Sequence, residues 1–309
     1  VTGISTFSEG IADDITINSV SVGKGANSVA GNTVVGETAL DAVTTGGNNT
    51  AIGGSALTEL TSGTSNVAVG QEALKVNTTG ASNTAVGRRA LDANTTGGSN
   101  TAIGNAALGA NTTASNNTAV GKDTLLANTT GHSNTAVGFE ACKDNVTSNN
   151  NTGVGYKSLE NQTGEKNTGL GAYTLGNGAT GSDSTALGYA ALYQNAASNN
   201  TAVGSNALYS NTTGSNNIAI GYVALTANTT GSQNVAVGNL ALDGNTTGDD
   251  NTAVGYNALS TTTGSSSNTA LGYSCLSNLT TGSSNVAVGH ASGDAITTGD
   301  QNCLVGKNS

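Results

Sequence analysis

Proline, methionine and tryptophan are absent from the 309 residues of this chain, and aromatic residues make up only 3% of it. Because proline carries no backbone N–H, its absence leaves every residue able to donate to a continuous ladder of main-chain hydrogen bonds. Few aromatics and 45 glycines would be typical of a disordered chain if they followed no pattern. The regular spacing of Ala, Val and Leu argues against disorder.

Charge is also scarce, since charged residues are 9% of the chain and the net charge is −10. There is no basic patch, so nucleic-acid binding has no electrostatic support. The chain has no run of 18 apolar residues and no signal-peptide pattern, so the sequence predicts no membrane insertion.

What the sequence does contain is one phrase, NTAVG at 83–87, which returns with small changes about every 17 residues. A fixed short period indicates a repeat architecture in which each unit contacts only its neighbours. Seventeen residues are too few for a helical hairpin but suit one rung of a β-solenoid. Ser184 replaces the first residue of one unit, and Asn18 opens a shorter unit of 14 residues. The anchoring Asn falls at 32, 49, 66, 83, 100, 117, 134, 151, 167, 200, 217, 234, 251, 268, 285 and 302.

This period predicts an all-β fold, a parallel β-solenoid with rungs of about 17 residues. We expect residues 1–17 to lead into a continuous solenoid of about 17–18 rungs over 18–309. Each rung is numbered from its anchoring Asn as position 1. Positions 2–4 alternate faces as a short strand. Position 4 is always Val, Ile or Leu, so we expect it to form a core column that shares its face with position 2, while the Ala at position 3 faces a neighbouring layer. Position 9, mostly Leu, predicts a second core column.

The remaining positions predict corners and turns. Position 5 is Gly in every unit from Gly36 to Gly306, as a corner with positive φ or a close backbone approach requires. The NTTG segment predicts a turn, and its stacked Asn and Thr side chains predict hydrogen-bonded ladders. We interpret its N-x-S/T sequons as this turn chemistry, because glycans on rungs about 4.8 Å apart would not pack. The sequons lie at Asn77, Asn94, Asn111, Asn128, Asn211, Asn228 and Asn245.

The apolar content of one rung is small: one aliphatic residue at position 4, one Leu and two or three Ala. Two apolar faces on so small a cross-section indicate that other subunits cover one of them. We therefore predict a parallel homotrimer in which three rolls share a central seam. A monomeric solenoid is the alternative.

Two stretches resemble known proteins. NSVSVGKGANSVAGNTVVG, at 18–36, resembles the head repeats of trimeric autotransporter adhesins, which share a V-x-(V/I)-G core. That resemblance implies a left-handed parallel β-roll in a trimer. The longer NTAVGxxALxxNTTGxxN unit is similar to the repeat shafts of bacteriophage tail fibres. The 17-residue rung departs from the adhesin pattern, and the resemblance, which covers about 18–306, brings no catalytic residue with it.

Residues with reactive side chains do not form a site in the sequence. Cys142, Cys275 and Cys303 occupy different rung positions, so we interpret them as small hydrophobic residues and not as a disulfide pair. His132 and His290 lie far apart, with no carboxylate cluster beside either. The sequence therefore predicts no catalytic residue, no cofactor and no metal site, and we expect the protein not to be an enzyme.

Aromatic residues gather at position 6 in the second half of the chain. Stacked in register, they would line one edge of the solenoid and could grip the sugar rings of a host glycan or contact a receptor. The alternative is that they pack between subunits or shield the solenoid edge. These candidate contact residues are Phe139, Tyr156, Tyr189, Tyr222, Tyr256 and Tyr273.

Taken together, these features predict a structural fibre shaft of a virion appendage, of the phage tail-fibre kind, that serves in host attachment. Its expected partners are its own copies and a host cell-surface glycan or protein. The alternative is a bacterial adhesin head at the cell surface that binds glycan or matrix. Ice binding, a third function, would need outward Thr in the order T-x-T, whereas Thr95 and Thr96 are adjacent.

Overall fold

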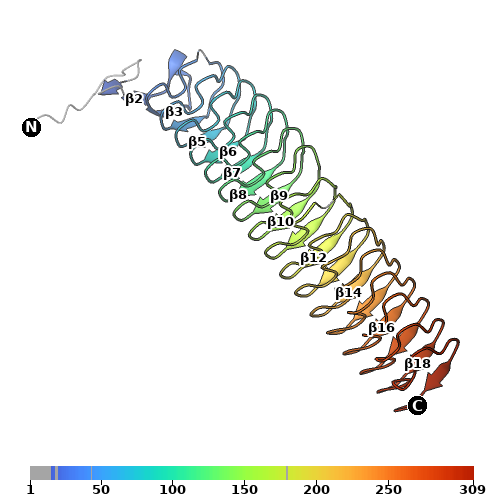
Figure 1. The fold of residues 1–309 in the computed structure, drawn as a ribbon. Coiled ribbons are helices and arrows are strands. Elements are labelled where there is room, and N and C mark those ends of the chain that lie inside the picture. Colours follow the sequence, from blue (N-terminus) through green and yellow to red (C-terminus); the bar gives the residue numbers. More distant parts are fainter. Residues whose placement is uncertain (1–14, 18–19, 43, 179) are drawn as a thin grey trace, which may run out of the picture. The chain divides into compact units, whose positions relative to one another are not determined.

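The computed structural model in Figure 1 describes residues 15–17, 20–42, 44–178 and 180–309. Asn18, which opens the 14-residue unit, lies outside these ranges, as does most of the leading segment 1–17. The described residues form two compact units, divided between Ser133 and Asn134, and each unit is described by itself. Apart from one 3-10 turn, η1 at Ala26–Ser28, every regular element of the described residues is a β-strand.

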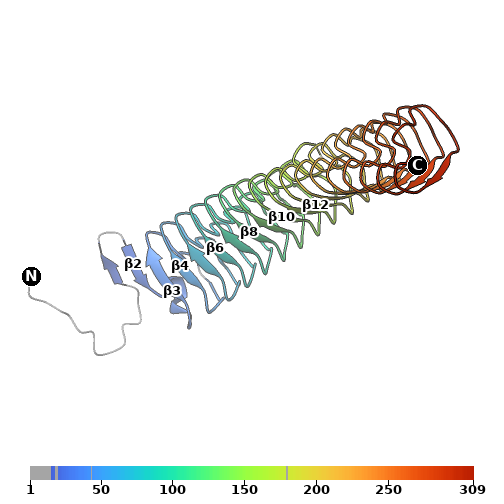
Figure 2. The same ribbon diagram turned by 90° about the horizontal axis from the view of Figure 1, so that it is seen from below.

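In the first unit, the strands from β3 onward run parallel and in register (Figure 2). Each residue pairs with the equivalent residue 17 positions along the chain, as Ala68 does with Ala85. Strand β2 differs, because it pairs antiparallel with both β1 and β3, so the parallel repeat begins at β3. The strands of this unit are β1 Ile15–Ile17, β2 Val20–Gly23, β3 Thr33–Gly36, β4 Thr50–Ile52, β5 Val67–Val69, β6 Thr84–Val86, β7 Thr101–Ile103 and β8 Thr118–Val120.

The second unit is a parallel stack throughout, from β9 to β19. Two of its rungs are one residue shorter, since Thr152 pairs with Thr168, and Thr185 with Thr201, over 16 positions. The shortening falls in the turn after position 12, so the strands keep their register. Its strands are β9 Thr135–Val137, β10 Thr152–Val154, β11 Thr168–Leu170, β12 Thr185–Leu187, β13 Thr201–Val203, β14 Ile218–Ile220, β15 Val235–Val237, β16 Thr252–Val254, β17 Thr269–Leu271, β18 Val286–Val288 and β19 Cys303–Val305. The predicted parallel β-solenoid is confirmed within each unit.

The inward and outward faces of the strands are the reverse of our prediction. Ala85, at position 3, is fully buried, whereas the position-4 residues lie outside, with Ile103 at 40% exposure. The reason is that position 3 lies directly against the leucine column at position 9, where there is little space. At Gly169, also in position 3, an added Cβ would lie 2.3 Å from Cδ1 of Leu159. Because position 3 faces leucine so closely, it holds Ala or Gly in the strands from β4 to β18, and the larger aliphatic residue of these strands points outward, whereas β3 and β19 carry Val34 and Leu304 there.

The leucine column at position 9 is confirmed as core, with Leu91 among many fully buried members. Cys142 takes the place of this leucine, and its burial raises the pKa of the thiol to about 12. Cys275 is also buried and donates its S–H to the carbonyl of Ala287, 3.1 Å away. Cys303 is exposed, and like the other two cysteines it is free and not part of a disulfide. It occupies position 2, which points outward with position 4.

The glycine at position 5 forms the predicted corner. Gly87 has φ +136, and a Cβ added there would lie 2.4 Å from the carbonyl oxygen of Gly104 in the next rung. Directly after this corner, the chain makes a tight turn in which non-glycine residues also adopt positive φ, including Leu91 at 53°. Left-handed backbone at leucine is unfavourable in isolation. The buried leucine side chain and the bonds between rungs hold it in this conformation.

Two ladders of asparagine side chains tie neighbouring rungs together. In the first, the anchoring Asn83 donates its backbone N–H to Oδ1 of Asn66, 3.0 Å away, and its amide to the carbonyl of Gly97. In the second, position-12 residues bond to one another, as Asn94 does with Asn77 over 2.8 Å. The second unit repeats both ladders with its own residues. The predicted asparagine stacking is thus confirmed.

The second ladder also accounts for the sequons. All seven asparagines that head an NTT sequon are fully buried. Asn211 illustrates the arrangement, since its amide donates both to Oδ1 of Asn195 and to the carbonyl of Gly214. An amide engaged in this way inside the solenoid is not presented for modification. The NTT sequons are therefore turn and ladder chemistry.

Candidate functional site

The six aromatic residues predicted as glycan or receptor contacts all lie in the second unit, directly after the glycine corner. Their side chains are exposed, with Tyr189 and Tyr222 each at 56%. They do not form one continuous row. The rungs between them carry a small or polar residue at position 6, namely Ala172, Ser205 or Asn239.

Stacking divides these residues into separate groups. The ring centroids of Phe139 and Tyr156 lie 5.5 Å apart and nearly parallel. Farther along, Tyr256 stacks on Tyr273 at 5.4 Å, and Tyr273 stacks on His290 at 5.0 Å. These are favourable separations for aromatic pairs. A face used in such a stack is closed to a ligand, so Tyr273, which is stacked on both sides, offers only its ring edge and hydroxyl group.

Three further tyrosines, which the sequence reading missed, join the row from other positions. Tyr173 lies at position 7 and contacts Tyr156 and Tyr189 edge to face, at 5.3 and 5.8 Å. Its partial burial and then its hydrogen bond with Tyr156 raise the pKa of the Tyr173 hydroxyl. Tyr193 and Tyr209 lie at position 10 and stack on each other at 5.2 Å. The aromatic residues at position 10 of two successive rungs are the sequence signal that could have identified this pair.

These tyrosines enclose an open groove of about 660 Å³ that follows four successive rungs of the second unit. Tyr173 closes one end, and Tyr193 and Tyr209 form one side. The position-7 residues between them are short, Ala190 and Asn206, and they leave the groove hollow. Its volume lies within the range of about 300–1,000 Å³ that is usual for small-molecule sites.

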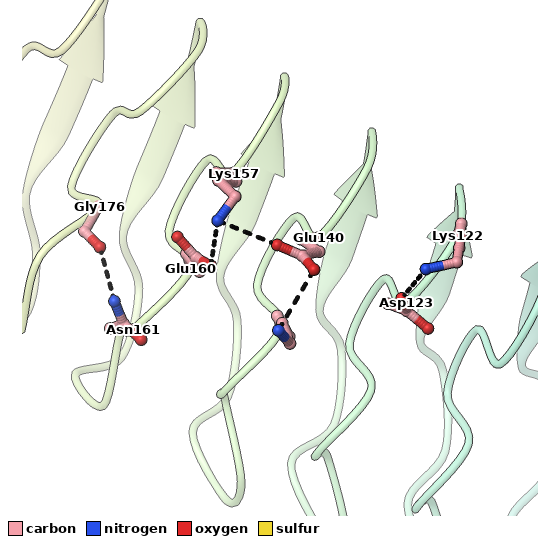
Figure 3. Close-up of polar contacts among 8 residues, drawn as sticks. Lys122, Asp123, Glu140, Lys157, Glu160, Asn161 and Gly176 are labelled. Atoms are coloured by element: carbon pink, nitrogen blue, oxygen red, sulfur yellow. Dashed lines mark hydrogen bonds and ion pairs between the residues drawn. The ribbon is translucent and has the colours of Figure 1, made fainter.

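Positions 7 and 10 carry ion pairs where they do not carry tyrosines. In the second unit, Nζ of Lys157 lies 3.1 Å from a carboxylate oxygen of Glu140 and 2.9 Å from one of Glu160 (Figure 3). These hydrogen bonds hold the pKa of Lys157 above its ordinary value. Burial would raise the pKa of Glu140, but the bonds from Lys157 and Lys143 outweigh it and lower the pKa. The same backbone sites therefore accept either charge or aromatic rings.

A second candidate surface is the outward face of the strands. In the first unit it displays Thr or Val at position 2 and Val or Ile at position 4, and in the second unit Leu appears there as well. Leu170 and Leu271 are 48% and 47% exposed. Isolated apolar residues on a surface need no explanation, but repeated columns of them mark an interaction face.

Comparison with known proteins gives no relative, since no family model, curated protein or solved structure matches this chain. Among the described residues, no three His, Cys, Asp or Glu side chains gather as metal ligands would. None of the helical structure described is long and apolar enough to cross a membrane. The fold defines the chain as a parallel β-solenoid repeat protein.

Proposed function

We propose that this protein is a non-enzymatic structural shaft of a virion appendage, of the tail-fibre kind, that serves in host attachment. The support for this proposal is the bonding between rungs, which makes the solenoid stiff. Parallel rungs within a unit are held to one another by main-chain pairing, and most of them also by buried asparagine ladders. Such bonding resists bending and gives proteases few open segments. The repeat similarity to tail-fibre shafts agrees with this role.

The observation that carries the proposal is the outward apolar face. Within each column of this face, neighbouring side chains are one rung apart, because Val69, Val86 and Ile103 pair in register on successive strands. A partner that packs along such a face must repeat with the same spacing. A second and third copy of this chain satisfy that condition, and a partner without the repeat does not. The shaft is thus a parallel homotrimer with these columns at its seam.

Native mass tests the assembly. Light scattering on the purified chain should give three times the chain mass of 29.9 kDa. A mass of one chain, unchanged over a range of protein concentration, would overturn the trimer. Immunogold electron microscopy tests the biological setting. Antibody against the chain should label the appendages of purified virions, and labelling confined to bacterial surfaces would favour the adhesin alternative.

A further inference from the structure

Two of the rings that line the groove in the second unit each keep a face without an aromatic neighbour among the described residues. Tyr193 stacks on Tyr209, but the next position 10 is Thr226, and no ring of the described residues covers the far side of Tyr209. Tyr189 has Tyr173 on one side only, since Ser205 follows it at position 6. Both Tyr189 and Tyr209 line the groove.

Polar groups in the groove are also unengaged. No side-chain hydrogen bond within the described residues involves the amide of Asn206 or the hydroxyls of Tyr193 and Tyr209. Asn206 uses its backbone instead, donating its N–H to the carbonyl of Tyr189 at 2.9 Å. Its amide therefore remains free to donate and to accept. The groove thus combines open ring faces with uncommitted donors and acceptors.

Charge is missing from the groove lining, which consists of tyrosines with Ala190, Asn206, Val223 and Thr226. In the rung before Tyr173, the ammonium group of Lys157 is already paired with the carboxylates of Glu140 and Glu160. A strongly charged ligand would find no counter-charge here. The groove follows four rungs, so it offers a length of about 14 Å at about 4.8 Å per rung.

We propose that this groove binds a neutral oligosaccharide along the axis of the rungs. The apolar C–H face of a pyranose packs on the open faces of Tyr189 and Tyr209, as amphipathic rings favour. Sugar hydroxyls bond to the Asn206 amide and to the tyrosine hydroxyls. The saccharide site thus lies on the flank of the solenoid, within one chain, and needs neither the trimer seam nor a separate tip domain.

Titration calorimetry with defined hexasaccharides tests this site. The probes are cellohexaose, maltohexaose and N-acetylchitohexaose, with hexagalacturonate as the acidic comparison. We expect at least one neutral probe to bind and the acidic probe to bind more weakly. Tyr209→Ala and Asn206→Ala should each weaken binding by about tenfold, which corresponds to about 1.4 kcal/mol. Tyr273→Ala removes a stacked tyrosine outside the groove and should leave the affinity unchanged.

Three results would overturn the proposal: no binding by any neutral probe, tighter binding of the acidic probe, or equal affinity in wild type and both groove variants. Circular dichroism and native mass accompany each variant, so that a fold defect is not taken for a lost contact. The double variant Tyr209→Phe, Asn206→Asp keeps the groove shape and separates polar contacts from stacking, and it should also weaken binding. A monomeric mass with intact saccharide binding would reject the trimer and leave this site standing.

Discussion

The side-chain amide of Asn94 donates a hydrogen bond to Oδ1 of Asn77, one rung earlier, across 2.8 Å of fully buried interior. Asn94 also donates to the carbonyl of Gly97 and accepts from Asn111. One amide thus satisfies polar groups on three rungs. Its burial would be costly without these partners, and with them it fixes the spacing between neighbouring rungs.

Replacement of this amide should destabilise the first unit. Asn94→Ala leaves the buried Oδ1 of Asn77 without its donor and takes one of two partners from the Asn111 amide, while the Gly97 carbonyl keeps its bond from Asn83. Since each unsatisfied buried group costs about 1–3 kcal/mol, we expect a loss of at least about 2 kcal/mol in urea denaturation. Asn105→Ala, at the more open position 6, is the control and should change stability by less than about 0.5 kcal/mol. Equal effects of the two changes would contradict a structural role for the ladder.

Glycine is required at the corner but not at the residue that follows it. Gly87→Ala should cost about 3 kcal/mol, because the new Cβ meets the Gly104 carbonyl at 2.4 Å and its φ is left-handed. Gly54, at position 6, offers the matched control, since a Cβ there has no neighbour closer than 4.0 Å. Gly54→Ala should be neutral or stabilise by about 0.5 kcal/mol. Thermal unfolding of both variants, followed by circular dichroism, measures the difference.

Charge on the outward strand face should dissolve the proposed trimer without unfolding the chain. In the variant Ile52→Asp, Ile103→Asp, each carboxylate would be buried unpaired in the seam, at a cost of about 3–5 kcal/mol. That cost weakens association at least about a hundredfold. Light scattering should then report a single chain with an unchanged circular dichroism spectrum. Thr96→Asp adds one such charge on an exposed turn and should leave the mass as it was.

Asp243 gives the second unit a pH dependence. Its burial raises the pKa above the ordinary value of 3.8, although bonds from its own N–H and that of Gly244 lower it. The folded state therefore holds the proton more tightly than the unfolded chain, and stability falls as pH rises from about 4 through the folded pKa. Oδ1 of Asp243 also finds no hydrogen-bond partner among the described residues.

Removal of this charge should accordingly stabilise the protein at neutral pH. Asp243→Asn is expected to raise the free energy of unfolding by about 1 kcal/mol at pH 7. As pH falls toward 3, below the ordinary pKa of 3.8, the wild-type carboxyl becomes protonated in both states, and the difference in stability between the two proteins should shrink toward zero. Asp250→Asn, at an exposed position, controls for net charge. A constant difference across pH 3–8 would show that the effect does not come from titration.

The period, the strand positions and the glycine corner could be read from the sequence because backbone geometry repeats with the residues. The orientation of the strand could not. Alternation along Thr84, Ala85 and Val86 identifies two faces without saying which one is inside. The larger side chain is normally the buried one, but here the leucine at position 9 already fills the interior. Only the distance between position 3 and that leucine decides which face of the strand is buried.

The tyrosine site was predictable in part, for a similar reason. Position 6 was recognised because its residues change character along the chain, from Lys122 to Phe139 and Tyr156. The groove depends on three columns at once, since Tyr173 and Tyr193 come from positions 7 and 10. Columns that are separated within a rung become neighbours through the tight turn. Its left-handed residues cannot be inferred from leucine or tyrosine, which rarely adopt positive φ.

The two 16-residue rungs show that a residue can be lost from the turn without shifting the pairing of Thr152 with Thr168 or of Thr185 with Thr201. The register of the strands therefore does not depend on the length of the turn. Unequal recombination between copies of the unit would insert or remove whole rows, and each event would create only one new junction. Such a gene can change the length of its product in steps of about 4.8 Å and can carry a binding surface along with each step. The length of the solenoid would then evolve by the gain or loss of whole rungs, with no redesign of the core.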